Sequence, residues 1–331
     1  MVVFMDGFDS YSSYNDILKR WWGGSLSSPT LPSGRHGGKA LDFSGGSIRT
    51  NFPTLNSFTA GMAIYLSSSL SSVTNIVHVY DQNDVHIRLK LDYTGKVYLI
   101  TIDGSNNETI LASSPPGKIS PNTYHYIEFQ VVCSTTATGY AELRVDSEVM
   151  GTFSGITIKY NQPQVNSLGL LSSYVIYDDL YITNNTTPNT GFLGDIKVAS
   201  HSVAGSGRTI EWIPQGTSNP ITAISSMDDD STYLHTAAAS GLALFTFSPA
   251  STGCTDIKAV QLILTSRKAT PGPRTAAGAV GNGSTEYIDT EYGLWDGMYG
   301  AKTYIYNTDP ITSGNWTTTI FNSRQFGIAA K

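Results

Sequence analysis

The stretch that decides the fold reads Val85-His-Ile-Arg-Leu-Lys-Leu91, then Asp92-Tyr-Thr-Gly95, then Lys96-Val-Tyr-Leu-Ile-Thr-Ile102. Apolar and polar residues alternate in the first segment, which is the period of a strand with one buried face. The next four residues are typical of a turn, and the third segment returns as the partner strand of a hairpin. The stretch therefore predicts antiparallel β-structure.

Similar strand patterns recur along the chain and make it all-β. We predict further strands at 58–66, 75–80, 124–132, 140–146, 174–182, 192–198, 241–247, 257–264 and 301–306. A helix of about two turns is expected at 13–20. The glycine-rich stretch 278–283 is interpreted as a flexible hairpin. No fixed-period repeat is present, which leaves two antiparallel β-sandwich (jelly-roll) domains as the expected fold.

Length and composition indicate two folded domains. The chain has 331 residues, of which 40% are hydrophobic and 14% charged, and its formal net charge is −6. A single core seldom extends beyond roughly 250–300 residues. The polar stretch 184–191 contains Pro and Gly and is typical of a connector. We therefore predict one antiparallel β-sandwich in residues 1–199 and a second, jelly-roll sandwich in residues 200–331.

Charge and hydropathy exclude several classes of partner. No basic stripe is present that could neutralise phosphates, so we expect no nucleic acid partner. No apolar run approaches the ~20 residues that span a bilayer, and the first residues lack the pattern of a secretory leader. We therefore expect no membrane partner. Cys133 and Cys254 are predicted to be free thiols.

The acidic residues do not form a recognisable catalytic pattern. Asp178 and Asp179 are neighbours on a predicted strand, where adjacent side chains face opposite sides, so we do not expect them to act as a pair. Glu142, Asp146 and Glu148 lack the order and spacing that the glycan hydrolases of this fold need. We assign no catalytic residue and predict that the chain is not an enzyme.

The densest acidic cluster consists of Asp228, Asp229 and Asp230. Oxygen-rich loops of this composition can bind Ca²⁺, which takes six to eight oxygen ligands. Three consecutive aspartates before a strand are more often a solvated turn. We therefore expect no metal and no cofactor, with Ca²⁺ at these three residues as the alternative.

Two groups of aromatic residues are candidates for a ligand site or an interface. Tyr292, Trp295 and Tyr299 lie in a predicted loop, and Trp21 and Trp22 are followed by two glycines. Aromatic rings stack on sugars and are also enriched in protein interfaces. The alternative for the loop is internal packing over the open end of the sandwich. For Trp21 and Trp22, capping of the core is the favoured interpretation.

Several short motifs resemble structural proteins of tailed bacteriophages. In the first half these are Gly34-Arg-His-Gly-Gly-Lys-Ala-Leu-Asp-Phe43, the strand from Tyr124, the hairpin 141–153 and Tyr177-Asp-Asp-Leu-Tyr-Ile182, which are similar to concanavalin A-like and laminin-G-like sandwiches. Gly191-Phe-Leu-Gly-Asp-Ile-Lys-Val198 looks like the stretch that follows the sandwich in those proteins. The second half, with Glu211-Trp-Ile-Pro214 and Asn315-Trp-Thr-Thr-Thr-Ile-Phe-Asn322, resembles their galactose-binding-like jelly roll.

The resemblance implies a non-enzymatic virion structural protein, accessory to the tail or to the capsid exterior. Its expected partners are other virion proteins of tail or capsid, its expected state is a homo-oligomer, and its expected location is the virion, assembled in the host bacterial cytoplasm. The alternative function is a carbohydrate-binding adhesin that recognises host surface glycans through its aromatic loops.

Overall fold

The computed structural model describes residues 1–22, 27, 29–171, 174–238, 240–270 and 272–331. The chain divides into two compact units. Unit 1 comprises Met1–Ser10 and Trp21–Ala199, and unit 2 comprises Tyr11–Arg20 and Ser200–Lys331. Both are built from antiparallel strands, which confirms the predicted all-β sandwich class. Within the described residues, no helix has the length and apolar character needed to cross a membrane.

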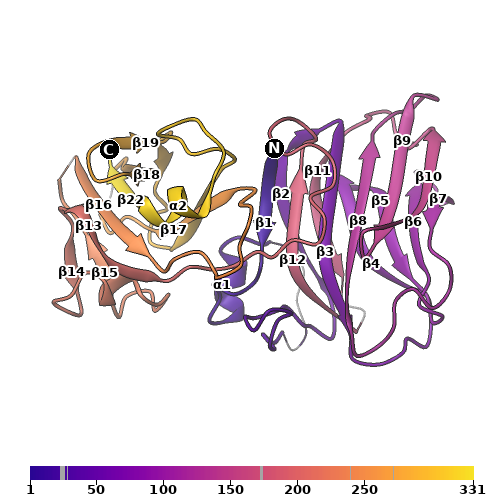
Figure 1. The fold of residues 1–331 in the computed structure, drawn as a ribbon, viewed down its shortest axis with the longest axis horizontal. Coiled ribbons are helices and arrows are strands. Elements are labelled where there is room, and N and C mark those ends of the chain that lie inside the picture. The colour runs from indigo at the N-terminus through magenta and orange to yellow at the C-terminus, as the bar shows by residue number, and fades with distance from the viewer. Residues whose placement is uncertain (23–26, 28, 172–173, 239, 271) are drawn as a thin grey trace. The chain divides into compact units, whose positions relative to one another are not determined.

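Unit 1 is a sandwich of two six-stranded sheets, drawn from indigo to rose in Figure 1. The first sheet has the order β1 (Val2–Asp6), β12 (Val175–Thr183), β3 (Ser57–Leu66), β8 (Tyr124–Val132), β9 (Gly139–Val145) and β10 (Glu148–Gly155). The second has the order β2 (Ser47–Leu55), β11 (Val165–Leu171), β4 (Thr74–Asp81), β5 (Asp84–Leu91), β6 (Val97–Ile102) and β7 (Glu108–Ser113).

Strand alternation places the core of unit 1 between these sheets. On β5 the side chains of Ile87, Leu89 and Leu91 are fully buried, while those of Arg88 and Lys90 project from the opposite face. This is the arrangement that the alternating stretch predicts, and β5 and β6 pair as the expected hairpin. Each sheet of unit 1 therefore has an inner face that forms the core and an outer face.

Unit 2 contains a six-stranded sheet and two strand pairs. The sheet has the order β13 (Val203–Ile210), β16 (Gly241–Phe247), β22 (Gln325–Ala330), β18 (Thr275–Gly281) and β19 (Glu286–Ile288), and β20 (Tyr292–Gly293) also pairs with β18. The pairs are β14 (Ile213–Gln215) with β15 (Tyr233–His235) and β17 (Val260–Ser266) with β21 (Gly300–Tyr306). The helices are α1 (Tyr14–Leu18), α2 (Thr318–Ser323) and the 3-10 turn η1 (Thr222–Ile224).

The glycine-rich stretch in unit 2 belongs to a hairpin as predicted, but residues 278–281 lie in a buried central strand, and the turn begins at Asn282 and Gly283. β18 pairs with β22 on one side and with β19 and β20 on the other, and its residues are almost all buried. The reason is close packing, because a Cβ at Gly278 would lie 2.7 Å from the ring of Tyr304 on β21. Glycine here makes room for an aromatic ring in the core of the unit.

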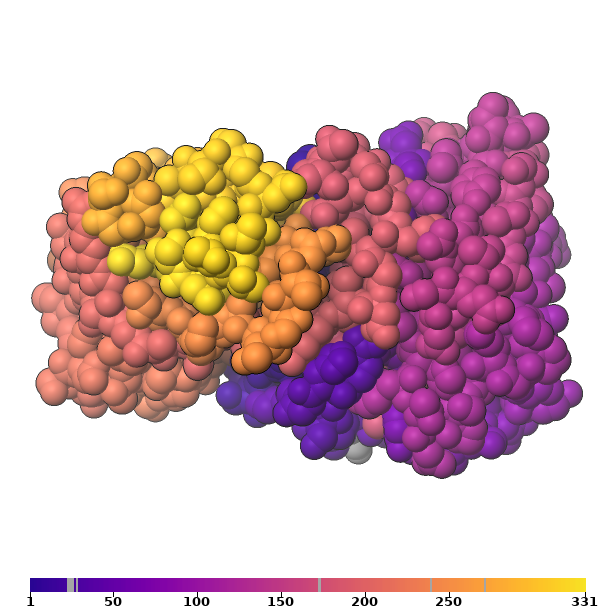
Figure 2. Space-filling view, in the orientation of Figure 1, coloured from indigo at the N-terminus to yellow at the C-terminus, as the bar shows by residue number. Residues whose placement is uncertain are grey.

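The predicted strand at 192–198 is not a strand, and this segment instead packs on the outer face of the first sheet. The N–H of Leu193 donates to the hydroxyl of Tyr181 (3.0 Å), and the N–H of Gly194 donates to the carboxylate of Glu128 (2.9 Å). Leu193 and Ile196 pack against buried Tyr126 and Tyr181. The stretch near residue 190, rose-coloured in Figure 2, lies at the surface of unit 1. Side chains of the first sheet thus accept hydrogen bonds from the backbone of this segment, as a neighbouring strand would in a sheet.

Asp178 and Asp179 face a common partner, contrary to the prediction that they point apart. The backbone N–H of Arg35 donates to Asp178 (2.8 Å), and the Arg35 guanidinium pairs with Asp179 (3.0 Å). The cause is a β-bulge between Asp178 and Tyr181, with Asp179 at φ +50°. A bulge interrupts the alternation of side chains along a strand.

Burial raises the pKa of these two carboxyl groups. Asp178 is 4% exposed, and burial together with the neighbouring Asp179 raises its pKa from 3.8 to about 7. Burial also raises the pKa of Asp179, against the opposing effects of the Val198 N–H and Arg35. Because the folded state binds a proton that the unfolded state has released, folding is favoured as the pH falls through this interval.

We therefore predict that unit 1 becomes more stable as the pH is lowered from above 7 toward 4, and that Asp178→Asn reduces this dependence. The variant removes the titrating group while keeping one oxygen to accept from the Arg35 backbone. Urea unfolding of the whole chain at several pH values measures the effect. A pH dependence that is equal in the variant and the wild type would contradict the assignment.

Candidate functional site

Trp21 and Trp22 have opposite environments. Trp21 is fully buried in the core of unit 1, where its indole N–H donates to Asp6 (2.8 Å). Its ring packs edge-on against Phe4 and stacks on Phe8, with centroids 5.3 and 6.0 Å away. Trp22 is 44% exposed. The favoured interpretation, core capping, therefore describes Trp21 and not Trp22.

Trp22 lies at the rim of a groove of about 470 Å³ on the second sheet of unit 1. Its backbone pairs with Arg49, each N–H donating to the carbonyl of the other (2.8 and 2.9 Å). This bridge extends the sheet beyond β2 by one residue. We call this depression the Trp22 groove, and its lining comprises Trp22, Arg49, Asn51, Phe52, Pro53, Thr54, Gln82, Asn83 and Asn166.

Cross-strand register brings the groove residues together from distant parts of the sequence. On β2, the side chains of Ile48 and Thr50 are buried. Because successive side chains of a strand point to opposite faces, those of Arg49 and Asn51 project from the outer face. Arg49 stands opposite Gly169 on β11. Directly opposite residues share a face of the sheet, and the missing side chain of Gly169 leaves space that a ring from β4 occupies.

That ring belongs to Tyr80, and it forms a stack with Arg49 and Trp22. A Cβ at Gly169 would lie 3.1 Å from the Tyr80 ring. The Arg49 guanidinium carbon lies 4.0 Å from the Tyr80 ring centroid and 4.8 Å from that of Trp22. Guanidinium groups at such distances are attracted to aromatic faces. Arg49 thus contacts both rings and also lines the groove.

One carboxamide of the groove, that of Asn166, is positioned by hydrogen bonds. The side-chain oxygen of Asn166 accepts from the Gln82 N–H (3.0 Å), and its amino group donates to buried Asp81 (3.1 Å). Gln82 occupies the turn between β4 and β5 with a φ of +50°. Asn51 is exposed. The lining therefore combines an aromatic face, a cation and amides that can both donate and accept.

A histidine lies next to this stack on the same strand. His78 Nδ1 is 3.3 Å from the Tyr80 hydroxyl. Burial, followed by the charges of Arg88 and Lys90, lowers the pKa of His78 to about 4, so the imidazole is neutral near pH 7. Burial raises the pKa of Tyr80, which keeps its phenol protonated. Arg88 and Lys90 both pair with Glu108.

The aromatic loop of unit 2 is internally packed to a large extent. Tyr292 is buried, and its hydroxyl is 2.7 Å from that of Ser266. The ring of Trp295 lies against Gly300, where a Cβ would be 2.2 Å from it, and its centroid is 5.7 Å from that of Tyr292. Tyr299 donates to the Asp229 carbonyl (3.0 Å) and to Asp230 (3.1 Å). These rings have partners within their own unit.

The three aspartates of the acidic cluster point to three different partners. Asp228 accepts from Thr232, Asp229 pairs with Lys19 (2.8 Å), and Asp230 pairs with Arg267. Within the described ranges, no group of three or more His, Cys, Asp or Glu residues is arranged to hold a metal. The Ca²⁺ alternative thus has no support from this geometry and stays a prediction.

Sequence reasoning named Trp22 but missed the other groove residues. Arg49 and Asn51 lie in a stretch that carried no strand prediction, and Gln82 and Asn83 lie between the strands predicted at 75–80 and 85–91. The alternation of Ile48, Arg49, Thr50 and Asn51 is a signal that could have placed Arg49 and Asn51 on an outer face. These residues lie near Trp22 only because of strand pairing, which is not evident from the sequence.

No protein-family model matches the chain, and no curated protein matches it. Solved structures do resemble it. An endo-β-1,4-glucuronan lyase from the fungus Trichoderma reesei is 12% identical at a TM-score of 0.37, over 58% of this chain and 92% of that one. Alginate lyase vAL-1 from a Chlorella virus is 9% identical at 0.42, over 49% and 91%. Domain 4 of the arabinanase AbnA from Geobacillus stearothermophilus, in complex with arabinotriose, is 17% identical at 0.36, over 55% and 91%. At these values the likeness shows the fold alone.

The comparisons contradict the prediction of a non-enzymatic structural protein of bacteriophage particles. The similar structures include several polysaccharide lyases, and nothing in the comparisons points to a virion protein. The prediction was wrong because it relied on short motifs such as 191–198, whose residues pack on the first sheet. The prediction that the chain is not an enzyme is withdrawn with it.

The two tryptophans give a matched pair of variants. We predict that Trp21→Ala lowers the free energy of unfolding by ~3–5 kcal/mol, because it opens a large cavity and removes a hydrogen bond to Asp6. Trp22→Ala is expected to cost less than about 1 kcal/mol, as an exposed substitution. Urea unfolding of both variants measures the difference, and equal losses would contradict the described orientation.

Proposed function

We propose that unit 1 binds carbohydrate in the Trp22 groove. The observation that carries the proposal is the partly exposed side chain of Trp22 (44%) beside Arg49 and four carboxamides, those of Asn51, Gln82, Asn83 and Asn166. Sugars present C–H faces that stack on aromatic rings and hydroxyls that pair with amide donors and acceptors. A shallow groove with one ring and several planar amides matches both requirements.

The position of the groove also supports the proposal. The segment 192–198 covers part of the outer face of the first sheet with the chain's own residues. The groove lies instead on the second sheet, where strands and a hairpin turn supply its residues. Groups held on strands keep their spacing better than groups on long loops, which suits a chain of regularly spaced sugars.

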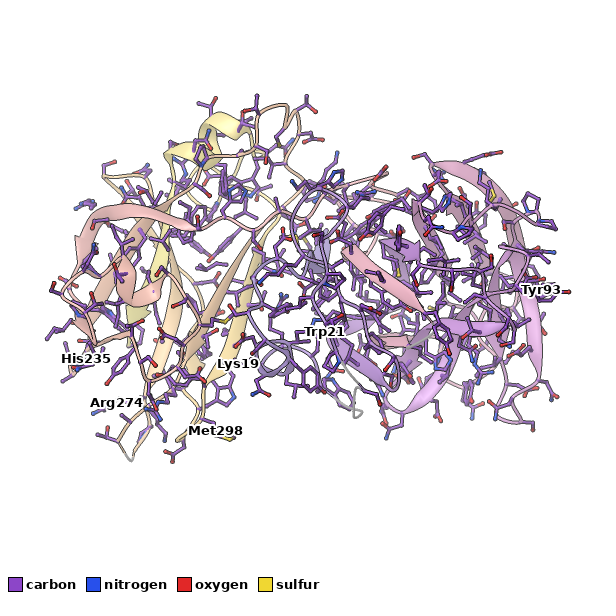
Figure 3. All side chains as sticks on the ribbon, turned by 90° about the horizontal axis from the view of Figure 1, so that it is seen from below. Lys19, Trp21, Tyr93, His235, Arg274 and Met298 are labelled. Carbon is purple, nitrogen blue, oxygen red and sulfur yellow. The ribbon has the colours of Figure 1, made fainter. Side chains whose placement is uncertain are left out.

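We predict that Trp22→Ala weakens glycan binding about tenfold, which is ~1.4 kcal/mol. The measurement is calorimetric titration of the whole chain with alginate and dextran oligosaccharides. Tyr93→Ala is the matched control, because Tyr93 is 61% exposed in the turn between β5 and β6 and points outward at the periphery of unit 1 (Figure 3). An equal loss in both variants, or no binding by the wild type, would count against the groove.

Catalysis on the bound sugar is a second candidate function, favoured by the pair of His78 and Tyr80. The protonated Tyr80 phenol lies beside the groove cation Arg49, and the neutral imidazole of His78 is at its hydroxyl. General acid–base catalysis needs a group that donates a proton and a second group that exchanges protons with it. Tyr80 would donate its phenolic proton to the glycosidic oxygen as the bond from that oxygen to the sugar carbon breaks. Water would add to the carbon, and His78 would pass the proton lost by that water back to Tyr80.

We predict that the wild type shortens a bound polysaccharide and that Tyr80→Phe, which keeps the ring under Arg49, does not. Size-exclusion chromatography of alginate and dextran after incubation with each protein measures chain length. If the wild type leaves all chain lengths unchanged while binding persists, catalysis is removed and the binding proposal stands.

A further inference from the structure

Arg49 lines the Trp22 groove, and its hydrogen bonds within the fold do not account for its positive charge. Its Nε donates to the Ser167 hydroxyl (2.8 Å), and Nη2 donates to the same hydroxyl and to the Gln82 carbonyl. All of these acceptors are neutral. A guanidinium carries five N–H donors. Among the described residues, Nη1 of Arg49 makes no hydrogen bond.

No carboxylate of the protein balances this charge. Among the described residues Arg49 forms no ion pair, and the residues outside the described ranges (23–26, 28, 172, 173, 239 and 271) include no Asp or Glu. Six other arginines in the described ranges each pair with an acidic side chain. They are Arg35, Arg88, Arg144, Arg208, Arg267 and Arg324.

The surroundings of Arg49 make an unbalanced charge costly. The guanidinium is partly withdrawn from water beside Trp22 and Tyr80, and this burial lowers the pKa of Arg49. Tyr80 is the one other group that influences that pKa, and it acts in the opposite direction. Charged groups removed from water are normally paired, and guanidinium groups pair best with planar oxyanions through two parallel bonds.

We propose that Arg49 recognises an anionic group on the sugar, so that the ligand of the Trp22 groove is an acidic polysaccharide. The inference rests on the proposed function. The sugar stacks on Trp22, and the Arg49 guanidinium binds its acidic substituent. A carboxylate and a sulfate ester present the same kind of oxygen pair, and the test separates them.

The test compares four polysaccharides with the whole chain. Alginate carries carboxylates, dextran sulfate carries sulfate esters, dextran is the neutral form of the same backbone, and polygalacturonate methyl ester has its carboxylates masked. We expect the wild type to bind alginate, dextran sulfate or both at least about tenfold more tightly than dextran and the methyl ester, and to lose this preference as salt is raised.

Two variants at Arg49 and one control locate the effect. Arg49→Gln should abolish the preference, and Arg49→Lys should recover part of it, because lysine keeps the charge but not the planar fork. Arg88→Gln removes the same charge from the same sheet face, but its guanidinium is already paired with Glu108 (2.8 Å), so the preference should remain. Urea unfolding identifies any variant that is not folded.

The outcomes distinguish the two proposals. Equal binding of dextran and the acidic polysaccharides, lost in Trp22→Ala, would overturn the role of Arg49 and leave the glycan groove in place. A preference for acidic chains that survives Arg49→Gln and disappears in Arg88→Gln would also overturn it. No binding of any of the four polysaccharides by the wild type would overturn the proposed function and the inference together.

Discussion

The contact on which the rest of unit 1 depends is the one between segment 192–198 and the buried carboxylates of Glu128 and Asp179. A carboxylate removed from water is unfavourable unless donors surround it. Glu128, at 1% exposure, receives the Gly194 N–H and the Tyr181 hydroxyl, and Asp179 receives the Val198 N–H and the Arg35 guanidinium. The segment therefore supplies hydrogen-bond donors to these buried carboxylates, and it covers part of the outer face of the first sheet.

In the second sheet, the pairing register of the strands determines which side chains lie together at the groove. Arg49 stands opposite Gly169, which in turn stands opposite His78, so three neighbouring strands align an arginine, an empty position and a histidine. A slip of one residue on β2 would turn Arg49 into the core and Ile48 outward. The burial of Ile48 and Thr50 thus fixes the direction of Arg49, and the empty position at Gly169 lets the Tyr80 ring lie beneath its guanidinium.

Much of the fold followed from alternation, and most of the site did not. The hairpin around Asp92, the strand from Tyr124 and the helix near Ile17 are local patterns that neighbouring residues determine. The paired orientation of Asp178 and Asp179 depends on a bulge, and the strand at Gly278 depends on a ring from β21. The exposure of Trp22, next to buried Trp21, depends on which of the two residues the core has room for. The lining of the groove comes from residues more than a hundred positions apart, whose proximity arises only through strand pairing.

The pairing of β1 with β12 has a consequence for how the chain is made. Val2 lies opposite Thr183, so the first strand of unit 1 to be synthesised pairs with the last strand of the same unit. At typical rates of synthesis its partner follows after roughly 10–35 s. Until then the apolar residues Val2 and Phe4 have no sheet to join, and Tyr11–Arg20 waits longer still, because it groups with the unit that begins at Ser200. The topology thus leaves this stretch without its sheet partner for most of the time that unit 1 is being synthesised.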